Sequence, residues 1–233
     1  MPLSTLIQRS SQPSPSLSEA QAHALLRAHF DLGGNLQALG SQQDLNLRLD
    51  SDQGRFVLKA CHGSYAEIEL QAQHAALAYL AEQGVPVPGV RAARNGETLL
   101  ALDVDGQPLR VRVLDYIEGQ SLTRLKHMPA SLMAELGALC AKVDLALADF
   151  DHPGLARTLQ WDPQHAQALI EHLLPVLGDT PRRAQLQGVV AQAVEVLTKV
   201  QAQLPSQAVH LDITDDNVVW QRDAQREWQL QGV

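Results

Sequence analysis

The sequence predicts a segregated α+β fold with two lobes, an antiparallel β-rich front and a mainly α back. Short apolar stretches bounded by turn residues fill 35–116, whereas 131–203 carry apolar residues at helical spacing. The 233 residues, 45% hydrophobic and 19% charged, are enough to bury a core of ordinary composition. We therefore divide the chain into a flexible arm (1–17), an N-lobe (18–116) and a C-lobe (117–233).

The N-lobe is expected to begin with a helix. Ser18 and Gln21 have the spacing of a capping box, which predicts a helix to about Phe30, closed by Gly33-Gly34. Three extended segments follow, and the second alternates leucine with polar residues, as a half-buried strand does. Their predicted ranges are 35–40, 44–50 and 55–61.

A second helix and a hairpin complete the N-lobe. Apolar residues at helical spacing predict a helix from about 65 to 83, and the two prolines within 85–88 force that segment to be extended. A hairpin is expected from strands at 99–102 and 109–116. In the C-lobe, Pro and Gly separate three predicted helices, at about 131–149, 163–177 and 182–203.

Composition excludes several functional classes. The net charge of −8 and the lack of a basic run argue against nucleic-acid binding. No apolar run approaches membrane-spanning length, so no membrane partner is expected. Cys61 and Cys140 lie far apart without metal-like spacing, which is typical of reduced core residues in a cytoplasmic protein.

The most informative motif is His210-Leu211-Asp212-Ile213-Thr214-Asp215-Asp216-Asn217, which reads H-x-D-x-x-x-x-N. This is the spacing of a kinase catalytic loop. Phosphoryl transfer to a hydroxyl needs a carboxylate that orients the attacking oxygen, and Asp212 would supply it. It also needs an oxygen that holds Mg²⁺ against the nucleotide phosphates, which Asn217 would supply. The apolar residues 218–220 predict a strand that fixes the end of the loop.

Lys59 ends the third predicted strand, and the next helix carries Glu67 and Glu69. Kinases place a strand lysine on the nucleotide phosphates and hold it with a glutamate of the following helix. A lone strand lysine is more often a solvent-exposed side chain. The order of strand, lysine, acidic helix, hairpin, helices and H-x-D-x-x-x-x-N loop favours the functional interpretation here.

The turn at 39–46 falls where a phosphate-covering loop belongs. Its small and polar residues, Ser41 among them, would let backbone N–H groups approach phosphate oxygens, although an ordinary hairpin turn explains it equally well. His210 is interpreted as a structural brace of the loop rather than a base. Asp215 and Asp216 are either solvated loop residues or a site that attracts a cationic group of the substrate.

Together these residues resemble the aminoglycoside-phosphotransferase and choline-kinase-like superfamily, over about residues 18–233. Four segments look most like its hydroxylysine-kinase-like branch: 40–46, Phe56-Val57-Leu58-Lys59, Phe150-Asp151-His152-Pro153, and Arg157 with Trp161-Asp162. The resemblance implies a two-lobed protein-kinase-like fold. It also implies a possible fusion to a class III aminotransferase-like domain, because bacterial members of that branch often have one.

The same resemblance implies the roles of individual residues. Asp212 would be the catalytic base, Asn217 a Mg²⁺ ligand and Lys59 the phosphate-binding lysine. The nucleotide base, of ATP or GTP, would meet backbone groups near Asp115, Tyr116 and Ile117.

The sequence departs from the family pattern at three places. Leu211 replaces the usual glycine of the loop, which would alter loop packing. Gln73 stands where the glutamate partner of the lysine is common, so Glu69, one turn earlier, is the candidate. The family continues past Val233 into a D-F-G-like segment with the main Mg²⁺ ligand. We therefore expect a truncated kinase domain whose natural reading frame continues, and which may be inactive as written.

The leading hypothesis is a small-molecule kinase domain that transfers the γ-phosphoryl group of ATP or GTP to an alcohol, such as an amino alcohol or a hydroxylated amino acid. One alternative is a catalytically inactive module that binds a nucleotide or metabolite. Another is a docking domain of a larger fused enzyme. Metal-dependent nucleotide binding would separate the first two hypotheses from the third.

Overall fold

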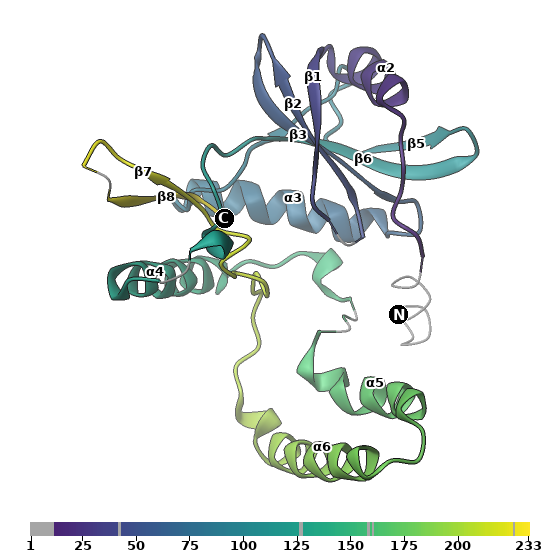
Figure 1. Ribbon diagram of the computed structural model, residues 1–233, viewed down its shortest axis with the longest axis vertical. Coiled ribbons are helices and arrows are strands. Elements are labelled where there is room, and N and C mark those ends of the chain that lie inside the picture. The colour runs from purple at the N-terminus through teal and green to yellow at the C-terminus, as the bar shows by residue number, and fades with distance from the viewer. Residues whose placement is uncertain (1–11, 42, 126–127, 158, 160, 226) are drawn as a thin grey trace. The chain divides into compact units, whose positions relative to one another are not determined.

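The chain forms two compact units in the computed structural model, which describes residues 12–41, 43–125, 128–157, 159, 161–225 and 227–233 (Figure 1). The larger unit contains Pro13–Leu155 and Gln207–Val233. The smaller unit contains Gln12 and Ala156–Ser206 among the described residues. The larger unit therefore holds all strands of the described residues, together with Lys59 and the H-x-D-x-x-x-x-N loop at 210–217. The division into lobes at 116/117 stays a prediction.

Helix α2 (Glu19–Phe30) begins with the predicted capping box. The amide of Gln21 donates to the Ser18 hydroxyl at 3.2 Å, and the Ser18 amide donates to Gln21 Oε1 at 2.7 Å. The helix ends earlier than Gly33-Gly34, because Asp31 takes a left-handed φ of 56° and its amide caps the carbonyl of Leu26. A short polar side chain tolerates that conformation, so the stop signal is an aspartate rather than the glycine pair.

The sheet is six-stranded and antiparallel, in the order β1-β2-β3-β6-β4, with β5 also paired to β6. The hairpin β5–β6 turns at Asp105-Gly106, where both φ angles are positive. The predicted strands are confirmed, with ends that move by a few residues at most. Their bounds are β1 Gly34–Leu39, β2 Leu45–Ser51, β3 Gly54–His62, β5 Leu100–Val104 and β6 Gln107–Asp115. The short strand β4 (Val90–Arg91) was not predicted.

Alternation along the strands gives the sheet one apolar face and one polar face. Helix α2 covers the apolar face and forms a buried core with it (Figure 1). Among the members of this core are Leu26, Phe30, Leu49, Leu58 and Val111. On the opposite face, Lys59 of β3 lies between Asn46 of β2 and Arg112 of β6 in one cross-strand row.

Helix α3 (Glu67–Glu82) buries Leu70, His74 and Leu80, together with the charged Glu69. It ends as predicted before Gly84, which has a φ of 71°. The segment after α4 lies directly on this helix, because a Cβ at Gly154 would come within 2.1 Å of the Ile68 carbonyl oxygen. Only glycine allows this approach.

A second buried cluster joins the end of α3 to helix α4 (Ala130–Leu147) and to the hairpin of β7 (Val219–Arg222) and β8 (Trp228–Gly232). Trp220 lies at its centre and is fully buried. The other members include Leu80, Val85, Leu132, Leu139, Val143 and Val218. Strand β7 confirms the strand predicted at 218–220.

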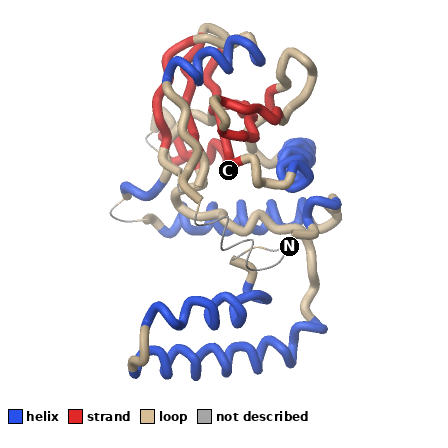
Figure 2. The backbone as a smooth tube through the Cα atoms, turned by 90° about the vertical axis from the view of Figure 1, so that its right-hand side faces the viewer, coloured by secondary structure: helices blue, strands red, loops and turns tan. Residues whose placement is uncertain are grey.

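In the smaller unit, helices α5 (Ala166–Leu173) and α6 (Pro181–Val200) lie side by side (Figure 2). Short 3-10 turns at Pro163–His165, Leu174–Leu177 and Gln201–Gln203 extend them to nearly the predicted ranges. Thr180 caps α6, since its hydroxyl accepts a bond from the Arg183 amide at 3.3 Å. Over the described residues, no helix combines the length and hydropathy required to cross a bilayer.

Candidate active site

The H-x-D-x-x-x-x-N loop at 210–217 leads directly into buried structure. Val218 and Trp220 follow it and are both fully buried. The backbone of Trp220 exchanges two hydrogen bonds with Gln120, at 2.8 and 2.9 Å. Gly119 permits this contact, because a Cβ there would lie 2.6 Å from the Trp220 carbonyl oxygen. The end of the loop is therefore fixed to the segment that follows the sheet.

Asp212 and Asn217 meet within this loop. The Asn217 side-chain amide donates to the Asp212 carboxylate at 2.8 Å and to the Asp212 carbonyl at 3.1 Å. The Asn217 backbone amide also bonds the Thr214 carbonyl at 3.1 Å, and the Asp215 carbonyl accepts a bond from the Leu122 amide at 2.8 Å. The two polar side chains named by the motif are thus brought together. Both remain exposed to solvent.

His210 braces the loop from its amino-terminal side. The Asp212 amide donates to His210 Nδ1 at 3.3 Å, which requires that nitrogen to be unprotonated. Desolvation lowers the pKa of His210, against the opposing fields of Asp212 and Asp144. A neutral imidazole that accepts a backbone bond agrees with the structural role expected from the sequence.

Leu211 has a left-handed backbone, with a φ of 73°. Residues with a Cβ adopt this region at a cost of about 1–2 kcal/mol. The family's glycine avoids that cost, so the departure at Leu211 strains the backbone as well as changing the packing. Its side chain is 50% exposed and recovers little of the cost by burial.

The loop offers a partial site for a divalent cation. The nitrogen of the Asn217 amide is used toward Asp212, which leaves Oδ1 as its metal-binding atom. Within the part of the chain that the structure describes, no group of three or more His, Cys, Asp or Glu residues could hold a metal ion. Mg²⁺ commonly takes one or two protein ligands and completes its shell with phosphates and water. The residues present fit that mode and do not form an all-protein cage.

Lys59 lies on the polar face of the central strand β3. Burial lowers the pKa of Lys59 and nearby Arg112 lowers it further, whereas Asp44 raises it. Among the described residues, no hydrogen bond or ion pair holds its ammonium group. The lysine is therefore a half-buried cation, not the solvent-exposed side chain of the alternative interpretation.

The two glutamates at the start of α3 differ in environment. Glu69 is 8% exposed, and its role as partner of the lysine stays a prediction. Glu67 is exposed, lies 3.8 Å from the guanidinium of Arg110, and accepts a bond from Gln71 at 3.0 Å. The pair with Arg110 is not evident from the sequence.

The turn before β2 is organised by Ser41, whose hydroxyl accepts a bond from the Asp44 amide at 3.0 Å. This is a side-chain turn of the ordinary kind. Gln42 lies outside the described residues. The phosphate-covering role of Ser41 stays a prediction.

The connector at 115–118 has backbone donors near the predicted nucleotide base. The Asp115 amide bonds the Gly89 carbonyl at 2.9 Å, and the Tyr116 amide bonds the Arg55 carbonyl at 3.0 Å. The amides of Ile117 and Glu118 make no backbone hydrogen bond within the described residues. Of the three residues predicted to contact the base, Ile117 is thus the one whose backbone N–H is available, and Asp115 could contribute only as an acceptor.

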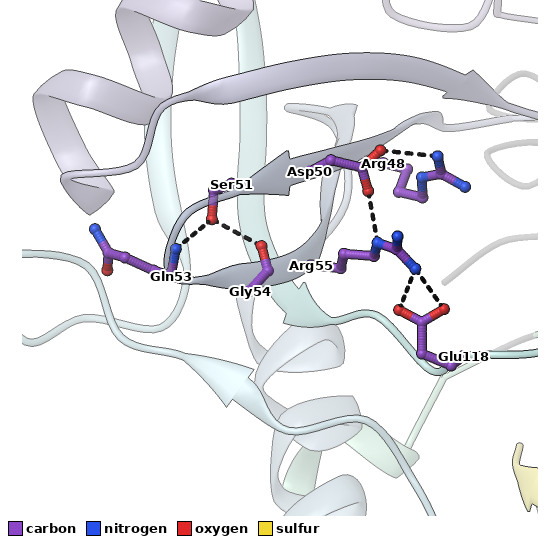
Figure 3. A network of polar contacts seen from close by, with 7 residues as sticks. All are labelled: Arg48, Asp50, Ser51, Gln53, Gly54, Arg55 and Glu118. Carbon is purple, nitrogen blue, oxygen red and sulfur yellow. Dashed lines mark hydrogen bonds and ion pairs between the residues drawn. The ribbon is translucent and has the colours of Figure 1, made fainter.

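Arginines on β2 and β3 tie the connector to the sheet (Figure 3). Arg55 contacts both oxygens of Glu118 at 2.7 Å, and its Nε lies 3.0 Å from Asp50. Arg48 also bonds Asp50 at 2.8 Å and stacks over the ring of Tyr116 at 5.5 Å. The sequence analysis missed this network, because its members are far apart in the sequence, with 63 positions between Arg55 and Glu118.

Known proteins similar to this chain include enzymes that act on hydroxylated amino acids. The hydroxylysine kinase of Mus musculus is 25% identical over 232 residues, which cover 91% of this chain and 61% of that protein. The homoserine kinase of Cupriavidus taiwanensis is 33% identical over 159 residues, or 67% of this chain and 44% of that protein. The chain thus spans between two fifths and two thirds of these relatives' length.

Solved structures share the fold. A microcompartment-associated aminopropanol kinase matches with a TM-score of 0.66 at 18% identity, over 91% of this chain and 68% of that one. An amicoumacin kinase in complex with AMP-PNP, Ca²⁺ and its substrate matches with a TM-score of 0.58 at 15% identity, over 94% of this chain and 60% of that one. These matches confirm the predicted kinase-like α+β fold. The profile of the phosphotransferase enzyme family matches residues 35–233, most of the chain, and the chain belongs to that family.

Proposed function

We propose that this chain carries the nucleotide-binding and catalytic-loop parts of a small-molecule kinase that phosphorylates an alcohol. The observation that carries the proposal is the hydrogen-bonded pair of Asp212 and Asn217 in a loop fixed by buried residues on its carboxyl side. The half-buried cation Lys59 on the polar face of the sheet supports it independently. Membership of the phosphotransferase family is consistent with both.

Asp212 would orient the acceptor hydroxyl and take its proton as the oxygen attacks the γ-phosphorus. The bond from Asn217 to one carboxylate oxygen holds Asp212 in place and leaves the other oxygen for the acceptor. Lys59 would contact the phosphates of the donor, and the free amide of Ile117 would bond its base. When bound through Asn217 Oδ1, Mg²⁺ would neutralise charge on the transferring group.

We favour an amino alcohol or a hydroxylated amino acid as the acceptor. The similar proteins are named for hydroxylysine, homoserine and aminopropanol, which all combine a hydroxyl group with an amine. Asp215 and Asp216 are exposed beside Asp212 and could attract the ammonium group of such an acceptor.

One feature favours a catalytically inactive nucleotide-binding module as the second candidate. The strained backbone of Leu211 sits directly before the proposed base, where a distorted loop would misplace the carboxylate. The distinction is whether phosphoryl transfer accompanies nucleotide binding.

The test is a transfer assay on the natural protein with ATP or GTP, Mg²⁺, and hydroxylysine, homoserine or aminopropanol. We expect a phosphorylated amino alcohol, detected by ³¹P NMR. Asn217→Ala should raise the Mg²⁺ concentration required for half-maximal rate and lower turnover. Nucleotide binding without transfer to any of these acceptors, or to a wider panel of alcohols, would favour the inactive module.

A further inference from the structure

Arg112 is a buried guanidinium for which the described structure provides no partner. Its side chain is 9% exposed, although it lies on a strand of the polar face. It forms no hydrogen bond or ion pair with any described residue. Burying an unpaired charge is costly, so such a group normally has a partner in the functional state.

The surroundings of Arg112 contain an excess of positive charge. Lys59 is its direct cross-strand neighbour, and side chains in such pairs start about 5 Å apart. Arg112 lowers the pKa of Lys59, and the carboxylate of Asp44 opposes the pKa decrease of both cations. His74 of α3 is also near enough for Arg112 to lower its pKa. Cys61 and Tyr65 are the other titratable groups that act on Arg112, and both raise its pKa.

Acceptor oxygens in the same row are also unsatisfied. Asp44 Oδ1 and Asn46 Oδ1 are buried without a hydrogen-bond partner in the described structure. Asn46 pairs with Lys59 across the strands, and the field of Asp44 acts on both cations. These acceptors do not bond the two cations, which therefore stay available for an anion. Polyphosphate oxygens only accept hydrogen bonds, so the two acceptor oxygens would need a separate donor or a metal cation that accompanies the ligand.

We propose that Arg112 is a second cation of the donor site, which binds a polyphosphate jointly with Lys59. The inference rests on the proposed function, because it names a further residue for the same nucleotide. An arginine fork offers two parallel donors to phosphate oxygens, whereas a lysine supplies a point charge. A dianionic or more highly charged phosphate chain would balance the excess charge of the row.

The test measures binding of ATP and of inorganic tripolyphosphate, a probe without a base, to wild type and variants by calorimetry. Arg112→Met should weaken both ligands by about 10-fold or more, the usual effect of a charge-assisted bond. Arg112→Lys keeps the charge without the fork and should lose less. Arg110→Gln is the matched control, because Arg110 points to the same face two residues away but is paired with Glu67, and it should change affinity less than about 3-fold.

The thermal stability of the protein without ligand distinguishes a ligand-binding role of Arg112 from a structural one. If Arg112 awaits an anion, Arg112→Met should be at least as stable as wild type when empty, and tripolyphosphate should raise its Tm much less. A Met variant that unfolds, together with a Lys variant of wild-type affinity, would make Arg112 structural and overturn the inference. Equal tripolyphosphate affinity in wild type and Arg112→Met would do the same. Arg112-dependent binding of tripolyphosphate without any binding of ATP would preserve the anion site and refute the proposed nucleotide function.

Discussion

The two parts of the candidate site hold their polar groups in opposite ways. On the sheet, Arg112 is buried and Lys59 is half-buried, and neither forms a hydrogen bond or ion pair with a described residue. In the loop, Asp212 and Asn217 are exposed and bond to each other. The strands therefore position these charged side chains through backbone hydrogen bonds between strands, in which the side chains themselves take no part. The loop positions its groups through the side chains themselves.

This difference has consequences for how each part fails. Removing a cation from the sheet should leave the fold intact and reduce attraction for anions. A change in the loop can disturb geometry as well as chemistry, because Asn217 is both a loop bond and a proposed metal ligand. The sheet part is thus sensitive to charge and the loop part to shape.

The largest expected effect separates chemistry from shape in the loop. Asp212→Asn keeps an oxygen that can accept the Asn217 bond but removes the carboxylate. Turnover should fall by about 10²–10⁴-fold while nucleotide affinity stays nearly unchanged. Steady-state kinetics and calorimetry on the natural protein measure the two quantities. Asp215→Asn, an exposed neighbour whose loop contact is made by its backbone, should keep kcat within about 3-fold. Wild-type turnover in Asp212→Asn would rule out the mechanism.

The second prediction concerns acid stability of the sheet part. Burial, and then Arg112, lower the pKa of His74 from 6.5 to about 4. Between these values the unfolded chain binds a proton that the folded chain excludes, so stability falls as pH drops from about 6.5 toward 4. At 1.36 kcal/mol per unit the loss is at most about 3 kcal/mol.

Denaturant unfolding at pH 7 and pH 4 checks this. His74→Gln can keep the bond to Thr98, which is 3.1 Å in the wild type, but it cannot titrate. It should lose less stability on acidification than wild type does. His172→Gln, at an exposed position, should follow wild type. If wild type and His74→Gln lose the same unfolding free energy between pH 7 and pH 4, the acid sensitivity does not come from His74.

How far the sequence predicted this molecule depends on the range of the interactions. The capping box at Ser18, the strand alternation and the Asp212–Asn217 loop all follow from residues within a few positions of one another. Arg112 and the bond from Arg55 to Glu118 depend on strand pairing across tens of residues. Strand alternation at 109–113 predicts that Arg112 lies on the other face of the sheet from the leucine and valines of that segment. Only the pairing register of β3 with β6 shows that Arg112 lies beside Lys59.

Leu211 shows a different limit of the sequence. The family has glycine at this position, but the sequence alone does not show whether the backbone conformation changes to accommodate leucine. The structure keeps the left-handed conformation and accepts the side chain. The backbone of the loop is therefore determined by its anchors at Val218 and Trp220 and by its internal bonds.

A third prediction tests whether the sheet part acts through charge at the phosphates. Lys59→Ala should weaken ATP binding by about 10–100-fold, because it removes a buried charge-assisted contact. Glu67→Ala should have a much smaller effect, since Glu67 is 55% exposed and its pair with Arg110 is long. Calorimetry with Mg²⁺ compares the variants. Equal affinities in wild type and Lys59→Ala would remove Lys59 from the site and with it the contrast between the two parts.

The smallest effect is expected at Leu211. Leu211→Gly relieves a left-handed backbone worth about 1–2 kcal/mol, but glycine adds about 0.5–1 kcal/mol of entropy to the unfolded chain. The net gain in unfolding free energy should be below about 1 kcal/mol, measured by denaturant titration. Val209→Gly is the matched control, because Val209 is similarly exposed at 51% and has no positive φ, so that variant should lose stability. If Leu211→Gly and Val209→Gly lose the same stability, the backbone of Leu211 is not strained. The loop would then have adapted its backbone to the leucine side chain, whereas the strands of the sheet position their side chains rigidly.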